Sequence, residues 1–190
     1  MNEKEPLAFR MRPKTLEEYV GQEHVIGPGK LLYRTIKADR LSSIILYGPP
    51  GCGKTSLAKV ISETTKYKFY KINAVTAGVA DIKRVVEETR NYMMNPTGKS
   101  ILFIDEIHRF NKLQQDALLP YVENGTIILI GATTENPYFE VNKALISRSM
   151  VIKLEPLTEK NIYNVLKRAL TSKEGLGEYN VKIEDSTLKK

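Results

Sequence analysis

The sequence predicts an α/β fold, in which a doubly wound parallel sheet of five strands is followed by the start of a small helical domain. Three observations predict it. Short apolar runs alternate with segments of helical periodicity, a glycine-rich turn follows the first run, and two carboxylates follow the third run. The pattern breaks at 155–157, Glu-Pro-Leu. We therefore expect an α/β domain over residues 1–156 and a truncated helical domain over 157–190.

Each expected strand is a short run rich in branched aliphatic or aromatic residues, which suits strands buried between two layers of helices. The five strands are expected near 44–47, 67–73, 101–104, 126–130 and 150–154.

Helices are expected where apolar residues recur every three or four positions after a capping residue. They are a short helix from Thr15, with Glu18 completing a capping box, then 31–40, a helix opening at Lys54, 79–86, a helix after Asn111, 137–146, and a helix after Thr158. Residues 181–190 suggest a short strand or turn and the first residues of another helix.

The composition excludes several classes of protein. One cysteine and two histidines permit no internal disulfide and no zinc cluster. The sequence has no apolar run of bilayer length and no signal-peptide core, so we expect a soluble, cytoplasmic protein with no membrane partner. The formal charge of +7 is compatible with a polyanionic partner, although the basic residues are scattered.

The stretch 44–56, IILYGPPGCGKTS, carries the strongest motif. It matches G-x-x-x-x-G-K-[ST], in which backbone N–H groups and a helix N-terminus hold a phosphate chain. Lys54 is then expected near the β- and γ-phosphates, and the Thr55 hydroxyl at Mg²⁺. The expected nucleotide contacts in this stretch are Gly48, Pro49, Pro50, Gly51, Cys52, Gly53, Lys54, Thr55 and Ser56.

Two acids end the apolar run 101–104, where unpaired carboxylates at a buried sheet edge would be costly. Beside a phosphate loop, Asp105 is expected to support Mg²⁺, and Glu106 to orient and deprotonate the attacking water. Thr133 and Thr134 follow a later strand, at the edge where open α/β sheets bind ligands, so one of them is a candidate contact for the γ-phosphate or the water.

Simpler interpretations stay open at this point. Thr133 also fits an ordinary loop, Asn136 a helix cap, and Arg148 a solvated or carboxylate-paired side chain. His24 and His108 fit structural positions better than catalytic ones, and Cys52 fits an inert small residue.

Several longer motifs carry a family resemblance. They are RPKTLEEYVGQEH, GPPGCGKT, ILFIDEIHRFNKLQQD, GATTENP and LISR. With them the chain resembles the AAA+ ATPases from about Pro6 to Leu157, and within them the replication-associated recombination protein A family, also called MgsA. The Werner-helicase-interacting ATPase is the eukaryotic relative of that family.

The resemblance implies roles at the matching positions. Residues 48–55 resemble the Walker A loop, while Asp105 and Glu106 resemble Walker B. Thr134 resembles sensor 1. Ser147 and Arg148 resemble the Ser-Arg pair of clamp loaders, whose arginine enters the neighbouring subunit's site. Asn73 resembles the polar switch that restrains the catalytic glutamate.

The resemblance also implies which residues surround the base. Near the N-terminus, the segment that cradles adenine would supply Arg12, Pro13, Val20, Gly21 and Gln22. On the first lid helix, Ile162 would close over the base.

The implied function is Mg²⁺-dependent hydrolysis of ATP to ADP in DNA replication, repair and recombination, at stalled forks or at junctions of single- and double-stranded DNA. The resemblance further implies a nucleoid location, a homo-oligomer of the full-length protein and a single-stranded-DNA-binding protein as partner. Arg109 and Lys112 are candidates to line a DNA channel, although a solvated helix start is the preferred interpretation of both.

Two alternatives remain. A clamp-loader or branch-migration subunit would share this chemistry, and an ATP-dependent interaction switch would bind ATP with little hydrolysis. Glu106 argues against the switch, because a pure binder has no use for a base. Family members continue through a full lid with a sensor 2 arginine and an oligomerisation domain. We therefore expect a chain that ends at Lys190 to bind nucleotide, to hydrolyse it poorly and to be monomeric.

Overall fold

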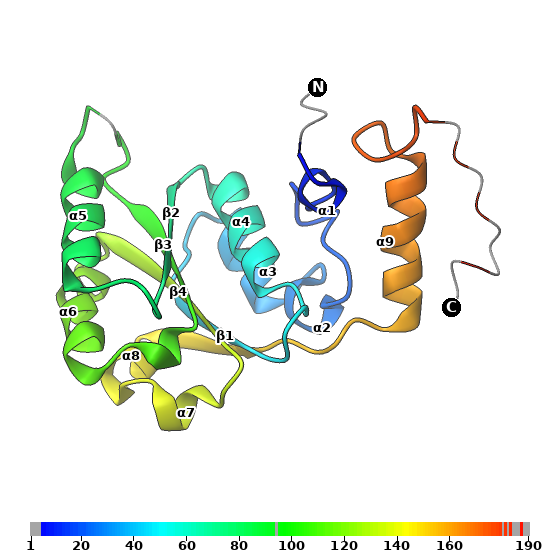
Figure 1. The fold of residues 1–190 in the computed structure, drawn as a ribbon. Helices are drawn as coiled ribbons and strands as arrows, with labels where there is room; N and C mark the ends of the chain where they lie inside the picture. The colour runs from blue at the N-terminus through cyan, green and yellow to red at the C-terminus, as the bar shows by residue number, and fades with distance from the viewer. Residues whose placement is uncertain (1–4, 94, 180, 182, 184–186, 188–190) are drawn as a thin grey trace.

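A computed structural model describes residues 5–93, 95–179, 181, 183 and 187. Within them, five parallel strands form one sheet in the order β2-β3-β4-β1-β5 (Figure 1). The expected doubly wound α/β fold is confirmed. The strands are β1 Ser43–Tyr47, β2 Lys68–Asn73, β3 Ser100–Asp105, β4 Ile127–Thr133 and β5 Ser149–Lys153.

The sheet places three functional segments of the sequence side by side. β4 lies between β1 and β3, with Tyr47 paired to Thr133 and Ile104 paired to Gly131. Because all the strands are parallel, the phosphate loop after β1, the acids after β3 and the threonines at the end of β4 meet at one edge.

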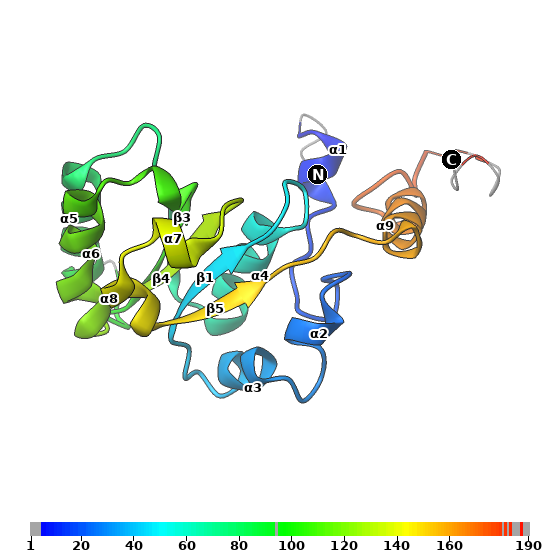
Figure 2. The ribbon, with the colours of Figure 1, turned by 90° about the horizontal axis from the view of Figure 1, so that it is seen from below.

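Helices cover both faces of the sheet (Figure 2). α3 Leu31–Lys37 and α4 Lys54–Thr65 pack on one face, where Leu57, Ile61 and Phe103 are fully buried. α5 Val79–Arg90 and α6 Lys112–Glu123 pack on the other face, around Ile82 and Leu118. The two apolar clusters hold the strands in place from both sides and so fix the edge at which the loops meet.

The helix expected from Thr15 does not form, so that prediction is wrong. The Glu18 N–H donates to Thr15 Oγ1 at 3.3 Å, but the Glu18 carboxylate accepts from Lys14 N and Arg168 instead of closing the capping box. The buried side chain of Leu16 draws the segment into turns against the core. The short helices of this region are α1 Leu7–Arg10 and α2 Glu23–Ile26.

The single helix expected over 137–146 is two helices, α7 Pro137–Glu140 and α8 Lys143–Ser147. Val141 between them is extended and buried in the core. Asn142 starts the second helix by accepting from the Ala144 N–H, and its own N–H donates to Gln115 Oε1 at 2.6 Å. Burial of Val141 therefore interrupts a helix that the periodicity of the sequence predicts to be continuous.

α9 Glu159–Thr171 begins at Thr158, whose side chain caps it as expected. In Figures 1 and 2 the helix stands beyond α1 and α2, apart from the sheet. Its apolar positions Ile162, Val165 and Leu166 are exposed, although the sequence pattern suggests a buried face. The strand or turn and helix expected over 181–190 fall mostly outside the described residues. No helix in the described part of the chain is long and apolar enough to cross a membrane.

Candidate active site

The phosphate loop joins β1 to α4 in a shape that requires glycine at two positions. Gly53 has φ +99°, and a Cβ there would lie 2.5 Å from Tyr19 Oη. A Cβ on Gly48 would lie 2.3 Å from the carbonyl oxygen of Leu154. Tyr19 Oη donates to Gly53 O at 3.1 Å, and burial raises the pKa of Tyr19 above its ordinary value. The N-terminal segment thus packs directly on the loop.

Lys54 opens α4, and its ammonium group lies inside the loop. Its Nζ donates to Gly48 O at 2.7 Å and to Pro49 O at 2.9 Å, while the side chain is almost fully buried. Beside it is a pocket of about 330 Å³, lined by Pro50, Gly51, Gly53, Lys54, Thr55, Ser56, Asp105, Glu106 and Thr134. The tertiary structure thus brings predicted residues from three separate stretches of sequence to one pocket.

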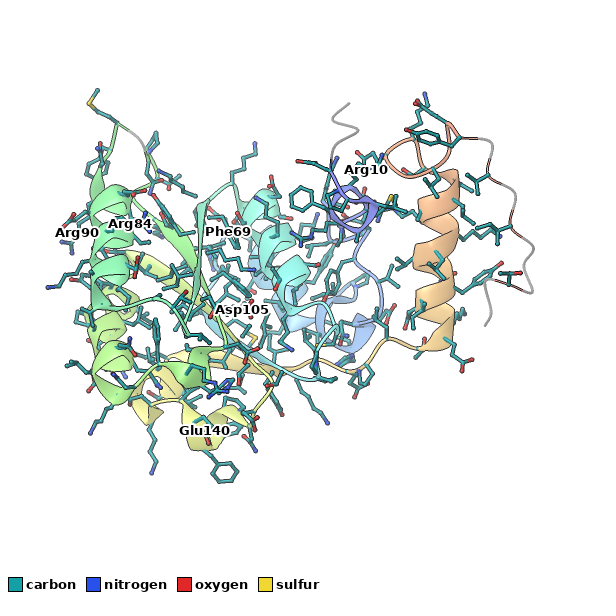
Figure 3. The ribbon with its side chains drawn as sticks, viewed as in Figure 1. Arg10, Phe69, Arg84, Arg90, Asp105 and Glu140 are labelled. Atoms are coloured by element: carbon teal, nitrogen blue, oxygen red, sulfur yellow. The ribbon has the colours of Figure 1, made fainter. Side chains whose placement is uncertain are left out.

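The two acids of this pocket differ in backbone geometry. Asp105 is the last residue of β3 and lies near the centre of the molecule in Figure 3, with Oδ2 3.6 Å from Lys71 Nζ. Glu106 has φ +56°, a left-handed conformation that is uncommon for residues with side chains. Because the chain turns sharply at Glu106, both carboxylates line the same pocket.

The oxygen donors of the pocket suit Mg²⁺. A threonine hydroxyl and an aspartate carboxylate are hard ligands of the kind that magnesium takes in phosphate-binding sites. Among the described residues, no group of three or more His, Cys, Asp and Glu side chains forms a self-sufficient metal site. Thr55 and Asp105 therefore fit an ion whose other ligands are phosphate oxygens and water.

The two threonines at the end of β4 differ in exposure. Thr134 is exposed and lines the pocket. Thr133 is fully buried, with its Oγ1 2.8 Å from His108 Nδ1 and accepting from the Glu135 N–H. Of the pair, Thr134 is therefore the residue available to a ligand. Asn136 caps α7, as its simpler interpretation predicts.

His108 lies beside the pocket, next to Glu106. The sequence did not predict this position. Its Nδ1 is 3.4 Å from Glu106 Oε2, and its side chain is 11% exposed. The feature of the sequence that could have indicated it is the position of His108, two residues after a pair of acids that follows an apolar run.

A second pocket, of about 170 Å³, shares Gly51, Gly53 and Ser56 with the first. Pro13, Val20 and Cys52, three of the expected nucleotide contacts, line it together with Leu157, Val165 and Arg168. It adjoins the phosphate loop and is lined both by the N-terminal segment and by α9, which makes it the candidate site for the base.

The other expected base contacts lie elsewhere. Arg12 stacks over the Phe9 ring at 4.7 Å and lines a third pocket, which shares Pro13 with the second pocket and Thr55 with the first. Gly21 packs against Leu157 and Asn161. On α9, Val165 lines the pocket, whereas the exposed Ile162 does not.

Gln22 has a structural position. It is fully buried, and its Nε2 donates to Glu155 O at 2.7 Å while its Oε1 accepts from the Glu155 N–H at 3.0 Å. Its Nε2 also lies 3.4 Å from Cys52 O. These backbone contacts use both ends of the amide, so the base-binding role expected of Gln22 does not fit.

Two further predicted residues lie outside both pockets. Asn73 pairs with Asp105 in the β2–β3 register, but its Oδ1 accepts from the Val75 N–H in the next turn. Arg148 ends α8 just before β5, at the opposite edge of the sheet from the pocket, and forms an ion pair with Glu123 at 2.6 Å. Five residues of β5 separate it from the pocket edge, roughly 15 Å of strand.

Comparison with known proteins decides the family. The model of the ATPase family associated with various cellular activities (AAA) matches residues 44–156, which span the five strands and the pocket. The chain belongs to the AAA family. The resemblance drawn from the motifs is therefore confirmed at this level.

Within the AAA family, close relatives carry the names that the motifs indicated. The chain is 51% identical over 181 residues to "Replication-associated recombination protein A" of Coxiella burnetii, covering 95% of this chain and 40% of that protein. It is 50% identical over 165 residues to "ATPase WRNIP1" of Dictyostelium discoideum, covering 87% of this chain and 19% of that protein. The chain therefore spans two fifths or less of these relatives' length.

Solved AAA structures include the Holliday junction branch migration motor RuvB of Thermotoga maritima. The superposition has a TM-score of 0.73 at 28% identity and covers 95% of this chain and 58% of that one. The likeness extends through α9, beyond the residues that the family model matches.

Proposed function

We propose that the protein hydrolyses Mg²⁺-ATP and uses the energy in DNA replication, repair and recombination, at stalled forks or at junctions of single- and double-stranded DNA. One observation carries the proposal. Lys54, Thr55, Asp105, Glu106 and Thr134 line one pocket beside a glycine loop that leads into a helix N-terminus. Phosphate-binding donors, metal-binding oxygens and a second carboxylate are thus available to one triphosphate.

Binding of ATP would begin at the loop. The N–H groups at the start of α4 and the ammonium of Lys54 would hold the phosphates, and the adjoining pocket around Pro13, Val20 and Val165 would hold the base. Thr55 and Asp105 would hold Mg²⁺, which when bound neutralises phosphate charge and orients the phosphate oxygens.

Hydrolysis would depend on Glu106 and Thr134. The Glu106 carboxylate would accept a proton from the attacking water, whose oxygen forms a bond to the γ-phosphorus as the bond to the β–γ bridging oxygen breaks. The products are ADP and inorganic phosphate. Thr134, exposed at the same pocket, would hydrogen-bond the γ-phosphate or the water.

Arg148 would act in a neighbouring copy of the chain. It lies at the far edge of its own sheet and its side chain is 42% exposed, so a second subunit would have access to it. A cation supplied in this way would offset the charge that develops on the γ-phosphate, and assembly of a homo-oligomer would gate hydrolysis.

The proposed role on DNA is supported by the names of similar proteins and by the net positive charge of the chain. Similar proteins include replication-associated recombination protein A and WRNIP1, and the chain carries a formal charge of +7. Arg109 and Lys112 are exposed next to the strand that ends in the two acids, where a DNA contact would be sensed by the site. A single-stranded-DNA-binding protein as partner and a cytoplasmic, nucleoid-associated location belong to the same proposal.

The test is phosphate release by the complete protein with MgATP, alone and with single-stranded, double-stranded and gapped DNA. We expect Mg²⁺-dependent release that gapped DNA stimulates and that Lys54→Ala abolishes. Lys59→Ala, which removes an exposed lysine paired with Glu63 one turn along α4, is the matched control and should retain turnover. Equal release by Lys54→Ala and the unaltered protein would contradict the proposal.

A branch-migration role is the second candidate, because the fold superposes on RuvB. The identity to that motor is 28%, compared with 51% to a replication-associated recombination protein, which favours the first proposal. Movement of a synthetic four-way junction by the complete protein would favour the second.

A further inference from the structure

We propose that His108 is a positioning residue, which holds the Glu106 carboxylate in the orientation needed to activate water. The inference rests on the proposed role of Glu106 as the base. It concerns a side chain that the sequence motifs leave without a role and that the tertiary structure places against Glu106.

The turn that carries both residues is anchored in the core. Ile107 is fully buried and its side chain lies over Gly131, while Phe110 is 3% exposed and its carbonyl oxygen accepts from Gln115 Nε2. The left-handed backbone of Glu106 is closed by a hydrogen bond from the Arg109 N–H to Glu106 O at 2.8 Å. A strained residue of this kind persists when its surroundings fix it, so the position of the imidazole is set by the fold.

The contacts of the imidazole are compatible with a proton on Nδ1. Nδ1 lies 2.8 Å from Thr133 Oγ1 and 3.4 Å from Glu106 Oε2. An ionised carboxylate only accepts hydrogen bonds, so attraction to Glu106 requires a proton on Nδ1. The Thr133 oxygen also accepts from the Glu135 N–H at 2.9 Å, which fixes that oxygen at the end of β4.

His108 therefore connects the base to the strand that carries the γ-phosphate contact. Thr133 belongs to β4, and the following residue, Thr134, lines the same pocket as Glu106. Because the imidazole lies between Glu106 and Thr133, the Glu106 side chain has fewer accessible rotamers. Its carboxylate therefore stays at a fixed distance from Thr134. Errors of about 1 Å in such a placement can cost roughly 100-fold in rate.

Asn73 was the residue expected to restrain Glu106, and its geometry supports that role less well. Its side-chain oxygen accepts from the Val75 N–H at 2.8 Å in its own turn, and the residue is exposed. His108, in contrast, is nearly buried and lies within contact distance of the carboxylate.

Two substitutions of His108 separate positioning from packing. In His108→Asn, the side-chain amide nitrogen takes about the place of Nδ1 and can donate in the same direction. In His108→Phe, the ring volume is kept and the donor is lost. His24→Phe removes the other histidine, an exposed side chain whose Nε2 is 3.3 Å from Lys153 O, and is the matched control.

The measurements are kcat and KM for ATP hydrolysis by the complete protein, with melting temperature as a check on folding. We expect His108→Phe to lower kcat by about 10- to 100-fold with KM and melting temperature nearly unchanged. His108→Asn should recover to within about threefold of the unaltered protein, and His24→Phe should have no effect.

Other outcomes overturn the inference. They are unchanged kcat in His108→Phe, equal loss in the Phe and Asn variants, or loss of kcat in Asn73→Ala without loss in His108→Phe. Glu106→Gln, assayed in parallel, distinguishes failure of the proposed base from failure of the positioning role. If it keeps full turnover, the proposed base is wrong. If it loses turnover while both His108 variants stay active, only the positioning role fails.

Discussion

The side-chain amide of Gln22 pairs with the backbone of Glu155 as a neighbouring strand would, one hydrogen bond in each direction, at 2.7 Å and 3.0 Å. This pairing fixes the N-terminal segment to the connection between β5, which ends at Lys153, and α9, which begins at Glu159. Residues on both sides of the contact, Val20 and Leu157, line the candidate base pocket.

Gln22→Ala is therefore expected to lower stability. It removes two part-buried hydrogen bonds between the buried Gln22 side chain and the backbone of Glu155, which costs about 1 to 3 kcal/mol in free energy of unfolding. Urea denaturation measures the change. Gln114→Ala, which removes the side-chain cap of α6 and a hydrogen bond to Ala77 O, is the control and should cost about 1 kcal/mol. Equal losses in the two variants would show that the Gln22 pairing adds little.

Glu106→Gln should separate binding from chemistry. The amide keeps the size of the side chain but is far too weak a base, so turnover should fall roughly 100- to 10,000-fold while affinity for MgATP changes little. Calorimetric titration gives the affinity and phosphate release gives the rate. Glu140→Gln, on α7 and labelled in Figure 3, is the control and should leave both quantities unchanged.

Arg148→Ala should abolish hydrolysis in the assembled protein without weakening nucleotide binding, because the residue is far from its own pocket. Arginines that enter a neighbour's site typically contribute about 1,000-fold or more in rate. Removing the arginine also frees Glu123, an exposed acid, so little change in melting temperature is expected.

Mixing two inactive proteins tests whether Arg148 acts between subunits. Arg148→Ala retains the base, and Glu106→Gln retains the arginine. In a head-to-tail ring formed from equal amounts, about one site in four would combine an intact base with an intact arginine. Recovered phosphate release supports action in the neighbouring site. A mixture as inactive as its components places the arginine elsewhere.

Stability at alkaline pH should depend on Tyr67. Burial, together with a hydrogen bond to the Asp39 carboxylate, raises the pKa of Tyr67 from 10.0 to about 12. The folded state therefore holds this proton more tightly than the unfolded chain. Its contribution is complete below pH 10 and is lost as the pH rises through about 12. Denaturant unfolding between these values should show a steeper loss for the unaltered protein than for Tyr67→Phe, and parallel profiles would contradict this.

The sequence predicted the chemistry of the site better than its surroundings. The phosphate loop and the two acids were recognisable because their residue types and spacing are local, and each follows a strand that apolar runs identify. The expected base contacts were harder to predict, because Gln22 is placed by hydrogen bonds to Glu155, more than 100 residues away in sequence.

Periodicity failed for two helices for a related reason. The Thr15–Glu18 capping box is a local signal, but the Glu18 carboxylate binds Arg168, which is 150 positions away. Likewise, the continuous helix expected over 137–146 is interrupted because Val141 is buried and Gln115, on another helix, binds the backbone of Asn142. Tertiary contacts outweigh local propensities of about 1 kcal/mol or less per residue.

The amino-acid order by itself determined the α/β class, the phosphate loop and the pair of acids, because these depend on neighbouring residues and on the alternation of strands with helices. Only the folded chain decided which threonine faces the pocket, that Val165 and not Ile162 lines the candidate base pocket, and that His108 lies against Glu106. Those choices depend on the strand order β3-β4-β1 and on the buried turn at Ile107, where distant segments compete for the same space.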